Sequence, residues 1–330
     1  MKATATANAN IALAKYWGQR DIALTLPANS SISMTLDGLS TKTTVEFSGG
    51  LKQDSLKIDG HAASREEIAR TSGFLDIVRK MHGTQIFARV ESENNFPKSA
   101  GLASSASGFA ALALAATRAL GMELDAIELS KLARRGSGSA SRSVFGGFVE
   151  WKKGSREDGS DCYATPIAPK EHWPELKMIV AVLTKKEKAV SSEKGMQLTM
   201  STSPLYNAWL GSADSDLEAA REAILEKDFN GLGKTAEMNC LKMHSTMLTT
   251  EPHLIYWEPE TIGLMKGIMG LREDGVECYF TIDAGPQVKV LCLEKDAKRI
   301  VKYLSFLPGV KETRVCGTGE GARIAKQGLF

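Results

Sequence analysis

The chain lacks an excess of charge of either sign. Its 330 residues carry 41 basic and 39 acidic side chains, for a formal net charge of +2. A nucleic-acid-binding protein normally shows a clustered excess of lysine and arginine. The balance therefore argues against nucleic acid as a partner, although a local basic pocket for a small anionic metabolite is compatible with it.

Cysteine is also scarce. The five cysteines are Cys162, Cys240, Cys278, Cys292 and Cys316. Their number is odd and no two of them form a C-x-x-C pair, so the sequence indicates neither a zinc site nor a disulfide framework. We expect most of them to be small buried side chains in a reducing compartment.

Long apolar runs are missing too. The N-terminal segment MKATATANAN has no apolar core behind a positive charge, so it does not predict a signal peptide. No run approaches the roughly 20 apolar residues that a membrane span needs. These absences predict a cytoplasmic protein with no membrane partner.

What is present is typical of a globular protein, with 43% hydrophobic and 24% charged residues. A chain of this length usually forms two packed domains. We expect an N-terminal lobe at residues 1–170 and a C-terminal lobe at residues 171–330. The segment 153–160 is a predicted surface turn that either joins the lobes or closes a hairpin within one of them.

The order of predicted elements favours an α+β fold. Strands are expected at residues 31–36, 41–47 and 85–91. Between them, residues 64–81 open with a capping box formed by Ser64 and Glu67 and continue at helical spacing. Further helices are predicted at 104–120, 194–245 and 260–271, and further strands at 277–282 and 288–293. Because strands and helices do not alternate, a doubly wound parallel sheet is disfavoured.

The segment NNFPKSAGLASSAS at 94–107 follows a strand and leads directly into a helix. Small residues allow the backbone to approach a ligand, and free N–H groups at a helix start attract an anion. Serine hydroxyls add donors for phosphate oxygens or ligands for Mg²⁺. The segment contains neither the Walker G-K-[ST] motif nor the dinucleotide G-x-G-x-x-G motif. The alternative is a serine-capped core helix after an ordinary loop.

The pattern P-x-x-x-G-L-A-S-S-A in this segment resembles the phosphate loop of the GHMP kinase superfamily. The resemblance implies a two-lobed fold, with a ribosomal-S5-like N-terminal lobe and an α+β C-terminal lobe. It also implies that ATP and Mg²⁺ bind here, with Ser105 as a ligand of Mg²⁺. The residues implied in nucleotide binding are Ala100, Gly101, Leu102, Ala103, Ser104, Ser105 and Ser107.

Five further segments narrow the family. They are NIALAKYWGQRD at 10–21, LPANSSIS at 26–33, RGSGSASRSVFGGF at 135–148, VSSEKGMQLT at 190–199 and YFTIDAGP at 279–286. In this order they resemble the diphosphomevalonate decarboxylase family. The resemblance implies a homodimeric enzyme that uses ATP to phosphorylate the C3 hydroxyl of mevalonate 5-diphosphate. Loss of that phosphate and of carbon dioxide then gives isopentenyl diphosphate.

Asp283 is the carboxylate of the last segment, between a strand and a Gly-Pro turn. Holding a tertiary hydroxyl in line with the γ-phosphate can contribute roughly 7–11 kcal/mol. The resemblance therefore assigns Asp283 to orient and partly deprotonate the C3 hydroxyl, and then to face the developing cation. The alternative is an aspartate that only initiates a turn.

Two cations complete the expected catalytic set. Lys15 lies in an apolar run, and because a buried lysine normally has a partner, we expect it to pair with Asp283 and to attract the transferred phosphate. The alternative is a solvent-facing lysine on an edge strand.

Arg142 can hold both oxygens of a carboxylate. The resemblance gives it the C1 carboxylate of the substrate, and the alternative is a structural bridge between the lobes.

The resemblance extends to residues around both ligands. Besides Arg142, the implied substrate-binding residues are Tyr16, Trp17, Gly18, Gln19, Arg70, Ser137, Gly138, Ser139, Ala140, Ser141, Glu193 and Met196. Asn29, Ser30 and Ser31 belong to a segment that lies near ATP in relatives. Aromatic side chains such as Tyr16 and Trp17 are equally expected in a core, and a helix arginine such as Arg70 is equally expected at the surface.

Two residues depart from the family. Gln19 stands where most members have a lysine that meets the diphosphate, and Glu193 stands where relatives carry arginine or threonine. A carboxylate facing a diphosphate is unfavourable unless Lys194 offsets it. Mevalonate 5-phosphate therefore stays open as an alternative substrate.

Two further functions compete with decarboxylation. A mevalonate 3-kinase would need the phosphate loop, but the grouping of Lys15, Arg142 and Asp283 disfavours it. An RNA-binding protein of S5-like fold would need a basic patch, and the charge balance disfavours it.

Overall fold

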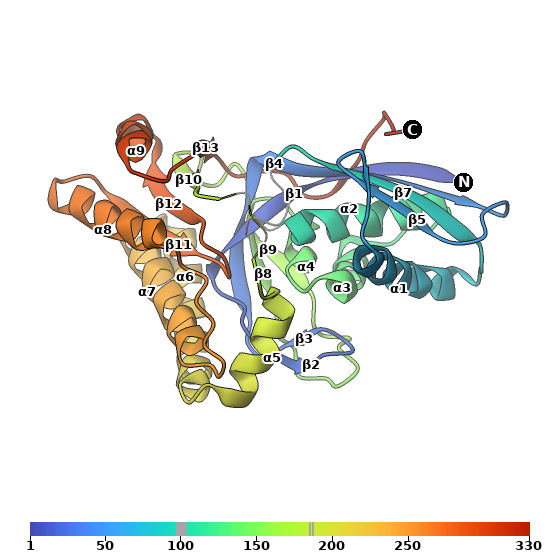
Figure 1. The fold of residues 1–330 in the computed structure, drawn as a ribbon, viewed down its shortest axis with the longest axis horizontal. Helices are drawn as coiled ribbons and strands as arrows, with labels where there is room; N and C mark the ends of the chain where they lie inside the picture. The colour runs from blue at the N-terminus through green and yellow to red at the C-terminus, as the bar shows by residue number, and fades with distance from the viewer. Residues whose placement is uncertain (97–103, 185, 187) are drawn as a thin grey trace.

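The computed structural model describes residues 1–96, 104–184, 186 and 188–330, and Figure 1 shows the fold. The strands of its larger sheet are β1 (Lys2–Ala14), β4 (Ser31–Ser48), β5 (Ser55–Ile58), β6 (His61–Ala62), β7 (Phe87–Asn94), β8 (Phe148–Trp151), β9 (Ala164–Ala168) and β14 (Arg323–Ile324). Their order is β14-β1-β4-β7-β5-β6, and β8 pairs with both β4 and β9. A short separate pair is formed by β2 (Gln19–Asp21) and β3 (Leu26–Pro27).

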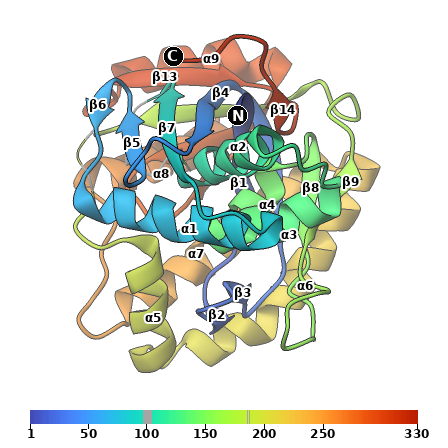
Figure 2. The ribbon, with the colours of Figure 1, turned by 90° about the vertical axis from the view of Figure 1, so that its right-hand side faces the viewer.

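Helices cover one face of this sheet. They are α1 (Arg65–His82), α2 (Ser104–Ala119), α3 (Ala126–Gly136) and α4 (Ala140–Ser143). Helix α2 packs on β1 and β4 through small side chains, among them Ala5 and Ala7 of β1 and Ala110 and Ala113 of α2. Alanines on both sides let the helix approach the sheet closely. Figure 2 shows α1 and α3 side by side in front of this half of the molecule.

The C-terminal half contains a second, antiparallel sheet of order β11-β12-β10-β13. Its strands are β10 (Leu176–Val182), β11 (Cys278–Ile282), β12 (Val288–Leu293) and β13 (Glu312–Cys316). The helices of this half are α5 (Ser192–Thr202), α6 (Tyr206–Glu226), α7 (Phe229–Leu248), α8 (Pro259–Glu273) and α9 (Glu294–Phe306). In Figure 1, α7 and α8 lie on the left, and β1 and β4 run between them and the helices of the N-terminal half.

One apolar core joins the two halves. It contains Ile11 and Leu13 of β1, Val180 of β10, Ala236 of α7 and Leu291 of β12, all fully buried. We call this cluster the shared core. Because it includes the end of β1 together with Tyr279 of β11 and Leu291 of the neighbouring β12, it fixes the two segments that carry Lys15 and Asp283 relative to each other.

The predicted α+β class is confirmed, and two element predictions are corrected. The strands expected at 31–36 and 41–47 form one continuous strand, β4, which bends at Gly38, where φ is +71°. The helix expected at 194–245 is instead three helices. Pro204 lies between α5 and α6, where its missing N–H ends the helical ladder, and Lys227 adopts φ +57° between α6 and α7.

The predicted capping box at Ser64 and the predicted burial of the cysteines are confirmed. Ser64 caps α1, its Oγ accepting from Glu67 N at 3.3 Å, while Ser64 N donates to Glu67 Oε2 at 2.9 Å. All five cysteines are free and buried. Of the helices in the described part of the chain, none combines the length and the apolar composition that crossing a membrane requires.

Candidate active site

The candidate site lies at the ends of two strands from opposite halves of the chain. Lys15 directly follows β1, and Asp283 directly follows β11. Strand β11 is an outer strand of its sheet, and helix α7 holds its free edge. There Cys240 Sγ accepts a hydrogen bond from Ile282 N at 3.1 Å. This contact fixes the direction in which the chain enters Asp283.

The Asp283 carboxylate lies between two lysines. Lys15 Nζ is 2.7 Å from Oδ1 and Lys289 Nζ is 3.1 Å from Oδ2, and each lysine side chain is only 1% exposed, against 28% for Asp283. We call this arrangement the Asp283 clamp. Burial opposes ionisation, but the two lysines hold the pKa of Asp283 well below its usual range. The predicted pairing of Lys15 with Asp283 is confirmed, and the alternative of a solvent-facing lysine is wrong.

Further hydrogen bonds position Lys15. Its Nζ also donates to Ala12 O at 2.9 Å, and its backbone N donates to Asn239 Oδ1 at 2.7 Å. Asn239 Nδ2 in turn donates to Asp216 at 2.9 Å, and Lys242 Nζ donates to the same carboxylate at 2.8 Å. Helices α6 and α7 therefore hold the chain at Lys15.

Arg142, on α4, is 3% exposed and is held by the two central strands of the larger sheet. Its Nε donates to Asn10 Oδ1 at 3.1 Å and to Ser33 Oγ at 2.9 Å, and its Nη1 donates to Ser31 Oγ. Burial lowers the pKa of Arg142 to about 10, although the charge of Asp283 opposes the shift. The guanidinium therefore lies within electrostatic reach of the Asp283 clamp.

A serine-rich turn at 137–139 connects α3 to α4. Ser137 Oγ lies 3.3 Å from Ser105 Oγ at the start of α2 and 3.5 Å from Ser139 Oγ. Asn10 Nδ2 donates to Ser139 O at 3.0 Å. The structure thus brings the predicted substrate turn next to the helix that follows the predicted phosphate loop.

The next residues of this turn face the protein interior. Ala140 and Ser141 are fully buried, and Ser141 Oγ donates to Gly138 O at 2.7 Å. These contacts indicate that both residues shape the turn. Any direct contact of theirs with a substrate stays a prediction.

Gly18 has a conformational reason to be glycine. Its φ is +109°, and a Cβ at this position would lie 1.8 Å from Tyr206 Oη. Trp17 and Met196 are 2% and 5% exposed and pack in the same cluster as Tyr206. The alternative that Trp17 is a core residue therefore accounts for the position of most of its side chain.

Several polar atoms around this cluster have no hydrogen-bond partner among the described residues. They include the buried Trp17 Nε1 and Tyr206 Oη. Buried polar groups in native proteins are normally hydrogen-bonded, so a ligand or water is expected to complete them. Burial also raises the pKa of Tyr16, which keeps its hydroxyl protonated and able to donate.

Arg70 lies on α1 and Glu193 on α5, and their opposite charges interact. Arg70 Nη2 donates to Gly136 O at 2.7 Å, and its guanidinium lies 4.8 Å from the centre of the Phe109 ring. Glu193, in the first turn of α5, is close enough for its charge to act on the pKa of both Arg70 and Tyr16. The family departure at Glu193 therefore faces the site, and Arg70 offsets part of its charge.

The predicted nucleotide-binding residues divide into three groups. Ala100, Gly101, Leu102 and Ala103 lie outside the described residues. Ser104 and Ser105 open α2, as predicted for an anion site at a helix N-terminus. Ser107, by contrast, is fully buried, with its Oγ 2.7 Å from Thr41 Oγ1, so its hydroxyl is already bonded in the core.

The segment 29–31 contacts both Lys15 and Arg142. Asn29 Nδ2 donates to Lys15 O at 2.7 Å, and Ser30 Oγ accepts from Lys153 N at 2.9 Å. Ser31 Oγ accepts from Arg142 Nη1. The contact of these three residues with ATP stays a prediction.

Sequence reasoning missed Lys188, Lys289 and Asn239. Lys188 Nζ donates to Ser192 Oγ at 2.6 Å and to Ala284 O at 3.0 Å, and burial lowers its pKa to about 8. A signal existed for Lys289, because a single charged residue inside the apolar strand VKVLCL requires a partner if the strand is buried. No comparable signal singles out Asn239 within α7 or Lys188 within its polar loop.

The charges at the site are unbalanced. Four cations, Lys15, Lys188, Lys289 and Arg142, act on the single carboxylate of Asp283. Such a surplus suits a ligand with several negative charges. Among the described residues no group of three or more His, Cys, Asp or Glu could hold a metal ion, so Mg²⁺ would bind mainly through ligand phosphates.

Family models cover most of the chain. Residues 7–164 match the diphosphomevalonate decarboxylase-like N-terminal domain, and residues 178–322 match the mevalonate 5-diphosphate decarboxylase C-terminal domain. The diphosphomevalonate decarboxylase of Candida albicans is 38% identical over 338 residues, covering 96% of this chain and 93% of the relative. That of Saccharomyces cerevisiae is 37% identical over 324 residues, covering 93% and 82%.

Solved structures agree with this assignment. Mevalonate diphosphate decarboxylase from Staphylococcus aureus matches with a TM-score of 0.93 at 42% identity over 98% of both chains. A structure of MDDEF in complex with MVAPP, AMPPCP and magnesium matches with a TM-score of 0.93 at 41% identity over 99% of both chains. These neighbours have the predicted GHMP kinase fold.

Proposed function

Because the chain belongs to the diphosphomevalonate decarboxylase family, we propose that it catalyses the ATP-dependent decarboxylation of mevalonate 5-diphosphate. The products are isopentenyl diphosphate, carbon dioxide, ADP and phosphate. The observation that carries the proposal is the Asp283 clamp, a carboxylate held between two lysines within reach of Arg142.

Asp283 orients the C3 hydroxyl toward the γ-phosphate and then faces the positive charge that develops at C3. Its lowered pKa keeps it ionised at neutral pH but makes it a weak proton acceptor. The carboxylate therefore acts mainly by orientation and charge, and complete proton abstraction has a minor part.

The cations bind the anionic groups of the two substrates. Lys15 and Lys188 attract the transferred phosphate, and magnesium bound to the nucleotide neutralises further phosphate charge. Arg142 already uses its Nε and part of Nη1 within the protein, which leaves Nη2 and the second Nη1 hydrogen for the C1 carboxylate of the substrate. Ser105, as a ligand of Mg²⁺, and the remaining substrate and nucleotide residues belong to the same proposal.

The relatives support mevalonate 5-diphosphate as the substrate. Their names are those of diphosphate decarboxylases, and one complex contains MVAPP with a nucleotide analogue. Neither mevalonate 5-phosphate nor simple C3 phosphorylation has comparable support. Gln19 and Glu193 remain local differences, and Arg70 lies opposite Glu193 to offset it.

The proposal predicts equal release of ADP and carbon dioxide. Purified protein with ATP, Mg²⁺ and mevalonate 5-diphosphate should release about one carbon dioxide for each ADP formed, and mevalonate 5-phosphate should give a much lower kcat/KM. A coupled ADP assay and trapping of ¹⁴CO₂ measure the two products. Accumulation of ADP without carbon dioxide would identify a C3 kinase, and at least a tenfold preference for the monophosphate would identify a phosphomevalonate decarboxylase.

A second prediction concerns pH. Burial lowers the pKa of Lys188 to about 8, so its charge is present below that pH and is lost as pH rises through it. We expect kcat/KM for ATP to fall over the same range, because free-enzyme groups determine this parameter. Lys188→Arg should move the fall to higher pH, while Lys153→Arg, at an exposed ion pair with Asp214, should leave it in place. An unchanged profile in Lys188→Arg would remove Lys188 from phosphate binding.

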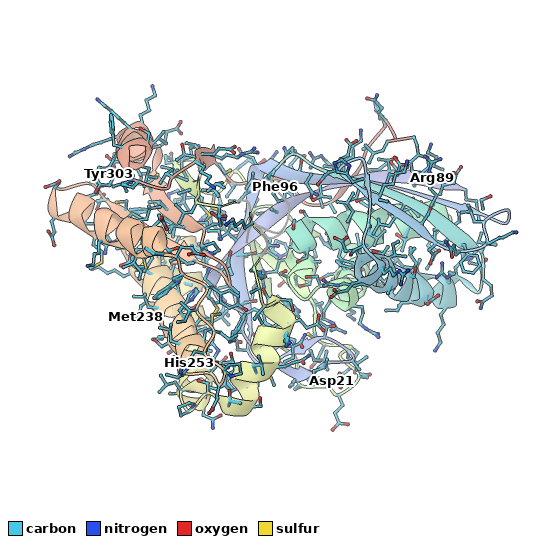
Figure 3. All side chains as sticks on the ribbon, in the orientation of Figure 1. Asp21, Arg89, Phe96, Met238, His253 and Tyr303 are labelled. Carbon is cyan, nitrogen blue, oxygen red and sulfur yellow. The ribbon has the colours of Figure 1, made fainter. Side chains whose placement is uncertain are left out.

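The remaining expectations are part of the same proposal. We place the enzyme in the cytoplasm as a homodimer, without a nucleic-acid or membrane partner, and we keep the lobe division at 1–170 and 171–330. Exposed apolar side chains on the outer C-terminal helices, such as Met238 on α7 and Ile262 and Met269 on α8, support a contact between subunits. Figure 3 shows Met238 on the side of α7 that faces away from β1 and β4.

A further inference from the structure

Lys289 is a charged residue on an apolar surface. It lies in β12, a central strand of the C-terminal sheet, paired with Val180 of β10 and Thr281 of β11. Two residues further along the same face, Leu291 belongs to the shared core, as does Val180. The Lys289 side chain is therefore surrounded by the core that joins the two halves of the protein, and only 1% of it is exposed.

A buried ammonium group in such a place is costly unless it is paired. Burial lowers the pKa of Lys289, and the nearby carboxylate of Asp283, 3.1 Å away, opposes this shift. An apolar side chain of similar length would fill the same space without the cost of desolvation. The charge at this position is thus better explained by what it does to Asp283 than by packing.

The geometry of the clamp shows what the second lysine adds. Lys15 binds Oδ1 and Lys289 binds Oδ2, so the two partners hold opposite oxygens of one carboxylate. A carboxylate held at one oxygen can still rotate about its Cβ–Cγ bond, whereas one held at both cannot. Lys15 comes from the end of β1 and Lys289 from β12, so the plane of the carboxylate is fixed by both halves of the protein.

We propose that Lys289 is a positioning residue that fixes the carboxylate plane of Asp283 and remains its partner when Lys15 turns to the transferred phosphate. The inference rests on the proposed function, because it concerns the orientation of the reacting hydroxyl. Lys15 has two tasks, binding Asp283 and binding phosphate, and Lys289 lies behind Asp283 in the shared core. Once Lys15 has turned to the phosphate, Lys289 is the lysine of the clamp that still holds Asp283. Without Lys289, neither lysine of the clamp would hold the carboxylate during phosphate transfer.

Other groups also act on Asp283. Lys188 precedes α5, Arg142 lies on α4, and Cys240 and His244 lie on α7. Cys240 and His244 are buried and neutral at physiological pH, since burial raises the pKa of the thiol to about 11 and lowers that of the imidazole to about 3. The positive groups that face Asp283 besides Lys289 are therefore Lys15, Lys188 and Arg142, and the test must separate Lys289 from them.

The test replaces Lys289 by methionine, which keeps the length and removes the charge. We expect kcat to fall between about 10-fold and 100-fold, as for a misplaced catalytic group, while KM for ATP stays within about twofold. Lys177→Met is the matched control, since Lys177 lies in the neighbouring strand β10 and pairs with Glu294 instead.

The outcomes are separable. A folded Lys289→Met protein with unchanged kcat overturns the inference, and so does an increase in KM for ATP without a change in kcat. If Lys289→Met does not fold, Lys289→Gln, whose neutral and shorter side chain removes the charge beside Oδ2, must lower kcat or the inference fails. Wild-type protein in the same assay tests the proposed function itself, because absence of carbon dioxide from wild type refutes that function and not the role of Lys289.

Discussion

Asp283→Asn should lower kcat by at least about 10³-fold while the protein stays folded. Asparagine has the shape of aspartate but cannot offer a negative charge to the developing C3 cation, and its amide donates toward lysines that also donate. The carboxylate is held at 2.7 Å and 3.1 Å by its two lysines, so the substitution changes charge more than position. Single-turnover measurement of carbon dioxide release gives the rate.

The same change should also reduce stability, because it leaves two buried ammonium groups without their anion. A loss of about 3–5 kcal/mol in the free energy of unfolding is expected for breaking such a pair. Since the folded-state pKa of Asp283 is lowered, its stabilisation is present above the unfolded-state pKa of about 3.9 and is lost as pH falls through the folded-state value. The difference between wild type and variant should therefore shrink in acid.

The matched control is Asp54→Asn. Asp54 forms an ion pair of 2.9 Å with Arg79, and both side chains are 5% exposed, but the pair lies in the N-terminal half at α1. Asp54→Asn should lower stability and leave kcat unchanged. A fall in kcat of similar size in both variants would show that lost stability, and not the position of Asp283, controls the activity.

Arg142→Lys should lower kcat/KM for mevalonate 5-diphosphate by about 100-fold or more, with KM for ATP little changed. Lysine keeps the charge but cannot bind Asn10, Ser33 and Ser31 through a planar group while it also holds a carboxylate. Initial-rate kinetics with each substrate varied in turn measure both parameters.

Arg134→Lys provides the comparison for this prediction. Arg134 is also 3% exposed, but its guanidinium donates to the backbone oxygens of Gly159 and Cys162, away from the Asp283 clamp. Its conservative replacement should cost stability without raising KM for mevalonate 5-diphosphate. If Arg142→Lys instead raised KM for ATP, Arg142 would belong to the nucleotide site.

The sequence was sufficient for the part of the site that a buried charge and the family resemblance indicate together. A lysine beside the apolar run that becomes β1 needs a partner, and the resemblance singles out Asp283, so the pair could be predicted before any coordinates. Lys289 could not be assigned a partner in this way, because a lysine between valines in a strand is also typical of a half-buried sheet with one face in water. Only the packing of β12 against the shared core shows that the face carrying Lys289 is buried and does not lie in water.

Long-range contacts account for the remaining differences. Asn239 lies in the interior of α7. Nothing near it in the chain indicates that its Oδ1 accepts a hydrogen bond from Lys15 N, in the other half of the protein. The resemblance predicts that Ser31 and Ser107 lie near the nucleotide, because their segments do so in relatives. In the structure Ser31 accepts from Arg142 and Ser107 lies beside Thr41, so tertiary neighbours use these hydroxyls.

The pairing of β14 with β1 has a consequence for biosynthesis. Among the described strands of the larger sheet, β1 is synthesised first, and β14, which covers its outer edge through the pairs Ala5–Ile324 and Thr6–Arg323, is synthesised last. Until then the nascent chain presents an open row of backbone donors and acceptors, which is a template for wrong pairing between molecules. Completion of the larger sheet must therefore wait until β14 has been synthesised, and protection by chaperones is most valuable during that interval.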